Sequence, residues 1–254
     1  MSGIHVIDDA PASASTLVAS YLTIRRAVGL SGLALPVMLV GGGWLSGVPI
    51  QDNMSSYYHT AMRDVFVGTL CAIGVFLFCY RGYDWMENWS ANVGGVSALG
   101  IALFPLDYAS DPLVQKSLSG YLHTVSGGVF FLTLASYSLY HFPRDARLEQ
   151  EPHLRERSWI YRASGLVILL CMVAMAAYLF LLGGRWKQWF NDFNFLLWME
   201  SIAVWSFAAA WLAKGRVIVA EIAVDVLAYA SELVLDDQRP DGQLPANDGW
   251  RRGS

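Results

Sequence analysis

Six long apolar stretches, separated by short polar segments, constrain the fold of this chain more than any other feature of its sequence. They lie at residues 27–48, 61–80, 90–106, 119–140, 159–182 and 194–213. An α-helix rises about 1.5 Å per residue, so a stretch of about 20 residues crosses a hydrocarbon core of about 30 Å. Only 15% of the residues are charged, whereas an average soluble domain carries roughly 25%. The sequence therefore predicts an all-α, polytopic membrane protein, a bundle of six transmembrane helices.

The distribution of basic residues predicts the orientation of this bundle. With the N-terminus inside, the cytoplasmic flanks hold Arg25, Arg26, Arg81, Arg144, Arg147, Arg155, Arg157, Arg162, Lys214 and Arg216. The other side holds only Arg63, Lys116, Arg185 and Lys187. Because Lys and Arg are enriched in cytoplasmic loops, we expect both termini in the cytoplasm. The acidic N-terminus lacks a signal-peptide pattern, so we expect a multi-pass protein of the cell membrane, most simply a bacterial inner membrane.

Three further segments flank the six-helix domain, which spans residues 27–213. Residues 1–26 are expected to form a cytoplasmic arm with an interfacial helix. Residues 214–235 are apolar but interrupted by Glu221, Asp225 and Glu232, which predicts an amphipathic helix lying along the bundle or the inner interface. Residues 236–254 have the composition of a disordered tail. The net charge of -4 argues against a nucleic-acid partner.

Unusual polar residues gather at the non-cytoplasmic ends of the stretches. The polar segment 51–66 reads QDNMSSYYHTAMRDVF, and a helix there would place Ser55, His59 and Arg63 on one face. His123 lies a turn inside the fourth stretch and Glu200 about two turns inside the sixth. A charge in hydrocarbon costs on the order of 2.5–3.5 kcal/mol. We therefore expect these side chains to point inward and to meet in one water-accessible cavity near the outer leaflet.

This expected cavity yields a set of candidate functional residues. The candidates for catalysis or proton transfer are His59, Asp64, His123 and Glu200. The candidates for substrate contact are Ser55, Ser56, Tyr58, Arg63, Asp107 and Ser126. The sequence leaves the pairing open: Arg63 can pair with Glu200 or Asp107, and His59 with Asp64 or His123. The exposed aromatic residues Trp186, Trp189 and Trp198 are typical of an aromatic belt, and we expect His5, His141 and His153 on the cytoplasmic surface.

Several chemistries can use such residues, and the sequence does not decide whether the chain is an enzyme. His59, Asp64 and His123 can hold a catalytic zinc ion that activates water, although no HExxH pair is present. Haem held by His59 and His123 has no other feature in its favour. The leading expectation is a protein that binds or modifies a lipid or amphiphile. The alternatives are a proton-coupled small transporter or channel component, and a non-catalytic membrane scaffold; the expected partners are membrane lipids, with a homo-oligomer also compatible.

The polar residues of three segments resemble a known pattern. SSYYHTAMRD, LHTVSGGVFF with His123, and FLLWMES with Glu200 resemble the six-span membrane family that includes the DRAM autophagy modulators and GPI-anchor lipid-remodelling proteins. The likeness covers most of residues 27–213 and implies a six-helix fold with a lipid-related role. SSYYHT is also similar to the Ser-x-x-x-His signature of the CREST hydrolases, the alkaline ceramidases, adiponectin receptors and hemolysin-III-like proteins, and maps onto Ser55 and His59. The paired His of their last span has no counterpart in WMESIAVWSFAAAWLA, which leaves their zinc site in doubt here.

Overall fold

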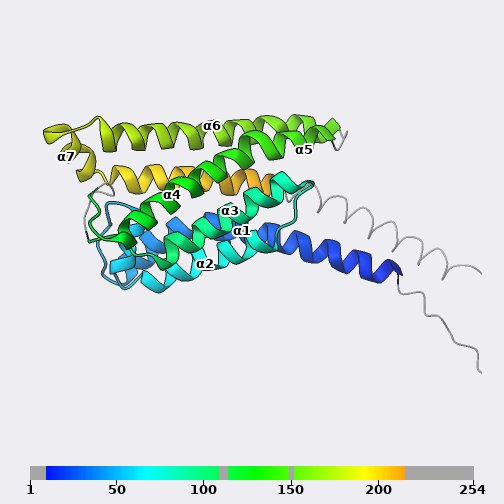
Figure 1. The fold of residues 1–254 in the computed structure, drawn as a ribbon, viewed down its shortest axis with the longest axis horizontal. Helices are drawn as coiled ribbons and strands as arrows, with labels where there is room; N and C mark the ends of the chain where they lie inside the picture. The colour runs from blue at the N-terminus through cyan, green and yellow to red at the C-terminus, as the bar shows by residue number, and fades with distance from the viewer. Residues whose placement is uncertain (1–9, 109–113, 149–151, 215–254) are drawn as a thin grey trace, which may run out of the picture. The chain divides into compact units, whose positions relative to one another are not determined.

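The computed structural model describes residues 10–108, 114–148 and 152–214, and these residues form helices without a β-strand (Figure 1). The α-helices are α1 (Ala10–Leu45), α2 (Arg63–Cys79), α3 (Trp85–Leu103), α4 (Leu118–Ser136), α5 (Phe142–Leu148), α6 (Pro152–Phe180) and α7 (Gly184–Asp192). A last helix spans Phe195–Lys214, and we call it the 195–214 helix. The 3₁₀ helix η1 (Met54–His59) precedes α2, and the π-helical turn η2 (Tyr137–His141) joins α4 to α5. The predicted all-α fold is confirmed for the described residues.

Four helical segments are long and apolar enough to cross a membrane. They are Thr23–Leu45, Leu118–Asp145, Ser158–Phe180 and Phe195–Lys214. α2 has 17 residues, about 25 Å at the rise of an α-helix, and α3 has 19 residues with Glu87 in its first turn. Both lie where the second and third crossings are expected. The membrane-protein class is thus supported by four helices, and six crossings stay a prediction.

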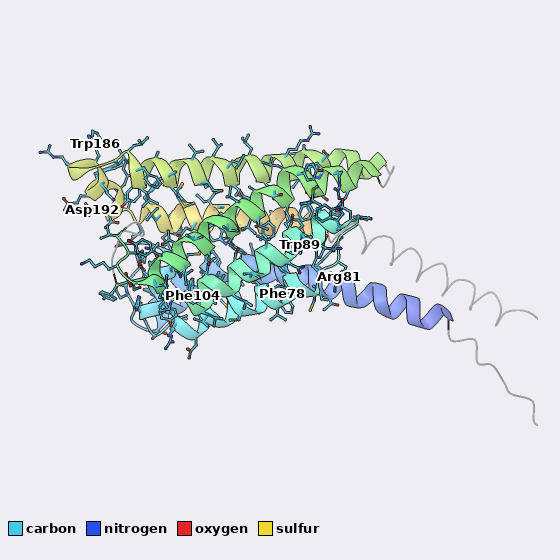
Figure 2. The ribbon with its side chains drawn as sticks, in the orientation of Figure 1. Phe78, Arg81, Trp89, Phe104, Trp186 and Asp192 are labelled. Carbon is cyan, nitrogen blue, oxygen red and sulfur yellow. The ribbon has the colours of Figure 1, made fainter. Side chains whose placement is uncertain are left out.

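The outward faces of the long helices carry large apolar side chains. Val96, Val125 and Val173 are each more than 60% exposed, whereas a soluble bundle would turn polar residues outward. Exposed tryptophans lie at both ends of the described bundle: Trp186 at the α7 end and Trp89 near the opposite end (Figure 2). This distribution fits helices whose outer faces contact lipid tails and whose ends reach the two interfaces.

The helices from α1 to α4 pack in chain order, and α6 packs on α4. α1 contacts α2, α2 contacts α3, α3 contacts α4, and α4 contacts α6. Glycines permit the closest approach, because a Cβ added at Gly74 of α2 would lie 3.1 Å from the carbonyl oxygen of Gly95 on α3. The 195–214 helix packs on α1, where a Cβ at Gly32 would lie 3.6 Å from the Ala208 side chain. Small residues of this kind are how helices in lipid gain contact area.

The connections between helices fall at two opposite ends of the bundle. The η1 end holds η1, the segment between α3 and α4, and α7; the α5 end holds the turn between α2 and α3, and α5 (Figure 1). The polar segment 51–66 therefore lies at the end opposite Arg144. The expected boundary at residue 26 falls inside α1, which runs unbroken from Ala10 to Leu45. Apart from Lys214, the segments 214–235 and 236–254 lie outside the described residues.

Candidate functional site

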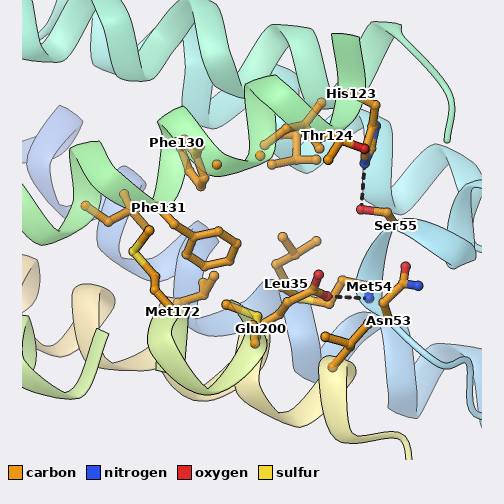
Figure 3. A pocket seen from close by; sticks show the side chains of 18 of the residues that line it. Leu35, Asn53, Met54, Ser55, His123, Thr124, Phe130, Phe131, Met172 and Glu200 are labelled. Carbon is orange, nitrogen blue, oxygen red and sulfur yellow. Dashed lines mark hydrogen bonds between the residues drawn. The ribbon is translucent and has the colours of Figure 1, made fainter. Parts of the chain in front are cut away.

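A cavity of about 290 Å³ lies inside the bundle and is covered at the η1 end by Asn53, Met54 and Ser55. Side chains from α1, α2, α3, α4, α6 and the 195–214 helix line it; Figure 3 labels Leu35, Asn53, Met54, Ser55, His123, Thr124, Phe130, Phe131, Met172 and Glu200. Most of this lining is apolar. The polar side chains of Ser55, His123 and Glu200 lie toward the η1 side of the cavity, and Phe130, Phe131 and Met172 lie on its other side (Figure 3).

The segment before α2 folds as a short cap and not as the start of a long helix. Asn53 is the N-cap of η1, and its Oδ1 accepts a hydrogen bond from the Ser56 N–H at 2.8 Å. η1 ends at His59, and Thr60 is extended, with φ -122° and ψ 179°. The expected single face of Ser55, His59 and Arg63 is therefore wrong, because the chain breaks before α2 begins.

His123 binds Ser55 through one ring nitrogen and the end of α3 through the other. Its Nδ1 lies 2.7 Å from the Phe104 carbonyl oxygen, and since a carbonyl only accepts, Nδ1 carries the hydrogen. In the neutral ring Nε2 is then the acceptor, and the Ser55 Oγ lies 2.8 Å from it (Figure 3). The Phe104 carbonyl is available because α3 ends at Leu103 and Phe104 is its C-cap, so no helical N–H follows to bind this oxygen.

Glu200 faces the same cavity from the 195–214 helix. Its Oε2 accepts a hydrogen bond from the Met54 N–H at 2.7 Å. A second bond fixes the register of this contact, because the Leu197 N–H donates to the Asp52 carbonyl at 3.0 Å. The 195–214 helix thus holds the segment 52–54 through two of its backbone groups. The Glu200 carboxylate binds Met54, the residue that precedes Ser55.

Four other candidates lie at the η1 end but outside the cavity. His59 is exposed, and its Nε2 lies 2.7 Å from the Leu106 carbonyl oxygen. Arg63 is also exposed and donates to the Tyr58 hydroxyl at 2.9 Å, with its guanidinium 4.7 Å from the Tyr58 ring centroid. Arg63 is therefore engaged by Tyr58 and not by Glu200 or Asp107. Asp64 is exposed in the first turn of α2, where the helix dipole favours a negative charge.

The remaining candidates support local structure. Asp107 holds the segment that leads into α4, including its N-cap Ser117: its carboxylate accepts from the Lys116 N–H at 2.6 Å, the Ser117 N–H at 2.9 Å and the Ser117 hydroxyl at 2.5 Å. These hydrogen bonds, that of the Ser117 hydroxyl first, hold the pKa of Asp107 below its usual range. Ser56 belongs to the η1 cap, and a Cβ at Gly100 of α3 would meet the Ser126 side chain. Of the ten candidate residues, the structure brings Ser55, His123 and Glu200 to the cavity.

The donor set does not fit the zinc site that the sequence left open. Among the residues that the structure describes, no three His, Cys, Asp or Glu side chains stand close enough to share a metal ion. His59 and Asp64 are exposed, and both ring nitrogens of His123 are engaged by Phe104 and Ser55.

A second buried polar cluster lies at the α5 end, centred on Glu87. The Glu87 side chain is fully buried, and its Oε1 accepts from the Tyr80 hydroxyl at 2.6 Å. Arg25 of α1 donates to the same Tyr80 oxygen at 2.9 Å. The Tyr83 N–H donates to the other Glu87 oxygen at 2.9 Å. Glu87 thereby connects α3 to α1 and to the end of α2.

Ion pairs extend this cluster to α5 and the 195–214 helix. Arg144 lies 2.7 Å from Asp84, and Lys214 lies 2.9 Å from the buried Asp145. The hydrogen bond from the Glu87 N–H, followed by that from Arg144, lowers the pKa of Asp84. We call this set the α5-end network; its members are Arg25, Asp84, Glu87, Arg144, Asp145 and Lys214. Its charges balance, which is what burial of ions requires.

This network is not among the sites expected from the sequence. The expectation that His141 lies on the cytoplasmic surface is wrong: His141 is 1% exposed, and its Nε2 lies 3.0 Å from the Ser90 hydroxyl. One signal was available, because Asp84 and Glu87 have the spacing of an N-cap and its third helical residue, and Asp84 does cap α3. Arg144, the cationic partner of Asp84, lies 60 residues away along the chain and carries no such signal.

Comparisons of the chain with protein-family models, with curated proteins and with solved structures found no match.

Proposed function

We propose that this chain is an integral membrane protein that holds a single-chain amphiphile in the cavity beneath η1. The observation that carries the proposal is the division of the cavity lining. One side offers Phe130, Phe131 and Met172 to an apolar chain, and the other offers Ser55, His123 and Glu200 to a polar head (Figure 3). Ligand sites of this design combine a mostly apolar wall with a few placed polar groups.

The size of the cavity favours a ligand with one chain. Pockets for small molecules span about 300–1,000 Å³, and this one has about 290 Å³. That volume accommodates part of one acyl chain with a small head, and it is too small for two chains. A fatty acid, a monoacyl ester or a lysolipid meets this condition, whereas a diacyl phospholipid does not.

Access from the membrane is proposed between α4 and α6. Gly127 and Gly128 of α4 line the cavity, and a Cβ at either would meet nothing within 4 Å. Phe180 of α6 also lines the cavity and is 70% exposed. A wall that is both cavity lining and outer surface gives a chain a route from the lipid tails to the polar side.

The topology proposed for this function has six crossings, with α2 and α3 as the second and third. α3 packs between α2 and α4. Its polar start, with Asp84 and Glu87, lies at the α5 end, because both residues pair with Arg144 there; Lys214 pairs with Asp145 at the same end. The bias of basic residues toward that end favours cytoplasmic termini. The cavity then opens toward the outer leaflet, and a bacterial inner membrane suits this arrangement.

Blocking the proposed route tests the function. In the protein reconstituted in nanodiscs, Gly128→Leu fills the space beside α4, and binding of a dansyl-labelled fatty acid should weaken at least about tenfold, about 1.4 kcal/mol. Gly68→Leu is the matched control, because Gly68 of α2 also faces open space but does not line the cavity. Equal binding by both variants would refute the proposal.

Reconstitution into sealed proteoliposomes separates binding from transport. A proton-coupled transporter would use the Glu200 carboxylate as its proton carrier, and Glu200→Gln would abolish a proton flux in proteoliposomes. A binding protein gives no proton flux with either residue. A flux that depends on Glu200 would replace our proposal with the transporter.

A further inference from the structure

We propose that Ser55 and His123 form a nucleophile and base pair that cleaves the ester of a single-chain acyl amphiphile. This inference rests on the proposed function, because the acyl chain must occupy the cavity to present its carbonyl to Ser55. It goes further by naming a reaction and the atoms that carry it out.

The hydrogen bonds around His123 have the order that a serine nucleophile requires. The Phe104 carbonyl accepts from Nδ1 at 2.7 Å and fixes the tautomer. Nε2, the remaining acceptor, lies 2.8 Å from the Ser55 Oγ. An activated serine is recognised by a base within about 2.6–3.2 Å and by a third group that orients the base. Here a backbone carbonyl takes the place of the orienting carboxylate of the Ser-His-Asp arrangement.

The segment that carries Ser55 is held firmly on both sides. The Met54 N–H is bound by Glu200 at 2.7 Å, and the Ser56 N–H is bound by Asn53 Oδ1 at 2.8 Å. Glu200 is thus a positioning residue for Ser55. Two fixed neighbours keep the Ser55 hydroxyl aimed at His123 and prevent the loss of alignment that slows a reaction.

Asn53 supplies an unpartnered amide donor, which a purely structural hydrogen bond between Ser55 and His123 would not need. Its side chain is 1% exposed and lines the cavity, and among the described residues its Nδ2 has no hydrogen-bond partner. The acceptor Oδ1 is already used by Ser56, so the free group is a donor. This donor lies two residues before the proposed nucleophile; turned toward the carbonyl oxygen of a bound ester, it would stabilise the negative charge that develops there.

The reaction consumes water and releases an acid and an alcohol. Ser55 Oγ bonds to the carbonyl carbon while its proton passes to His123 Nε2. The ester C–O bond then breaks, and the leaving alcohol takes that proton from Nε2, which leaves an acyl-serine. A water molecule attacks this ester, gives its proton to Nε2, and Ser55 leaves with the proton as the free acid forms. Every atom of the ester and of water is accounted for, and His123 returns to its neutral form.

A serine-directed probe on the full chain in detergent tests the pair. A fluorophosphonate carrying an alkyl chain should add one label to the wild type, located at Ser55 by peptide mass spectrometry. Ser55→Ala should lose the label, and Ser46→Ala, which removes an exposed hydroxyl at the same end, should keep it. A folded wild-type protein that stays unlabelled, or a label that persists in Ser55→Ala, would overturn the proposal.

The role of His123 is tested by rate and by pH. General base catalysis contributes on the order of 10²–10⁴-fold, so His123→Gln should slow labelling by about 100-fold or more and remove the rise of the wild-type rate with pH. Asn53→Asp keeps the oxygen that caps η1 and removes the donor. It should lower the kcat for a medium-chain p-nitrophenyl ester on the order of 10²-fold. A rate and pH profile unchanged in His123→Gln would overturn the assignment of the base.

Binding measured in parallel distinguishes this inference from the proposed function. If the wild type binds the dansyl fatty acid and Gly128→Leu binds it at least about tenfold more weakly, the cavity is occupied whatever the labelling shows. Binding without labelling or ester cleavage would overturn the nucleophile and leave the binding protein. A wild-type protein that does not bind the dansyl fatty acid would overturn the proposed function itself.

Discussion

The ion pair between Lys214 and Asp145 provides the sharpest test of the packing at the α5 end. The two side chains are 5% and 0% exposed and lie 2.9 Å apart. Removing one partner of such a pair leaves an uncompensated buried charge, which costs about 3–5 kcal/mol. Asp145→Asn should have the larger effect, because Asp145 also lies 3.7 Å from Arg144 and its loss affects two cations. Lys214→Met should cost less, since Arg144 still faces the carboxylate.

The expected change in thermal stability follows from these energies. A loss of 1 kcal/mol lowers the Tm of a chain of 150–250 residues by about 2–4 °C, so Asp145→Asn should lower it by roughly 6–20 °C. The double variant Asp145→Leu/Lys214→Met should recover most of this loss, because apolar residues replace buried ion pairs at little cost. Arg185→Met removes an exposed cation of α7 and serves as the control.

The assay is thermal unfolding of the purified protein in detergent, followed by tryptophan fluorescence. Trp211 reports on this end, because its ring centroid lies 5.2 Å from those of Tyr80, Tyr137 and Phe142. A Tm for Asp145→Asn that matches that of Arg185→Met would refute the reasoning, as would a double variant no more stable than Asp145→Asn.

Two further predictions concern the other end of the bundle and its helix contacts. The lowered pKa of Asp107 gives stability that is present above the ordinary carboxyl pKa of 3.8 and is lost as the pH falls through the lowered folded value. Between about pH 5 and about pH 3 the Tm of the wild type should fall more steeply than that of Asp107→Asn, and parallel curves would contradict the stabilising role of the Asp107 hydrogen bonds. Gly74→Ala should destabilise by about 1–3 kcal/mol because its Cβ meets the Gly95 carbonyl. In the same chemical-denaturation experiment Gly68→Ala, which faces open space, should be neutral or up to about 1 kcal/mol more stable; equal effects would contradict the close contact.

The positions of the helices could be predicted because apolarity is a local property of the sequence. The stretch expected at 194–213 is the helix Phe195–Lys214, and the stretch at 159–182 lies within α6 and its end. The cost of burying charge also gave the inward direction of His123 and Glu200 without knowledge of their partners. Both arguments need only the residues of one helix and the nature of its solvent.

The partners of these residues could not be predicted, because they depend on where a loop folds back. Asn53 caps the start of η1, and η1 places Ser55 against His123, 68 residues away, while His59 binds the Leu106 carbonyl. The spacing of Ser55 and His59 in the sequence does not show which of the two side chains reaches His123. The α5-end network shows the same limit: Lys214 and Asp145 are 69 residues apart, and each alone reads as an ordinary flanking charge.

An experimental density map of the protein in nanodiscs, prepared from its native membrane lipids, tests the central claim most directly. We expect one elongated density in the cavity, with its chain along Phe131 and Met172 and its head near His123 and Glu200. A cavity that holds only isolated water peaks at a resolution sufficient to show lipid tails, or one closed by Phe131, would contradict the claim that this chain holds an amphiphile.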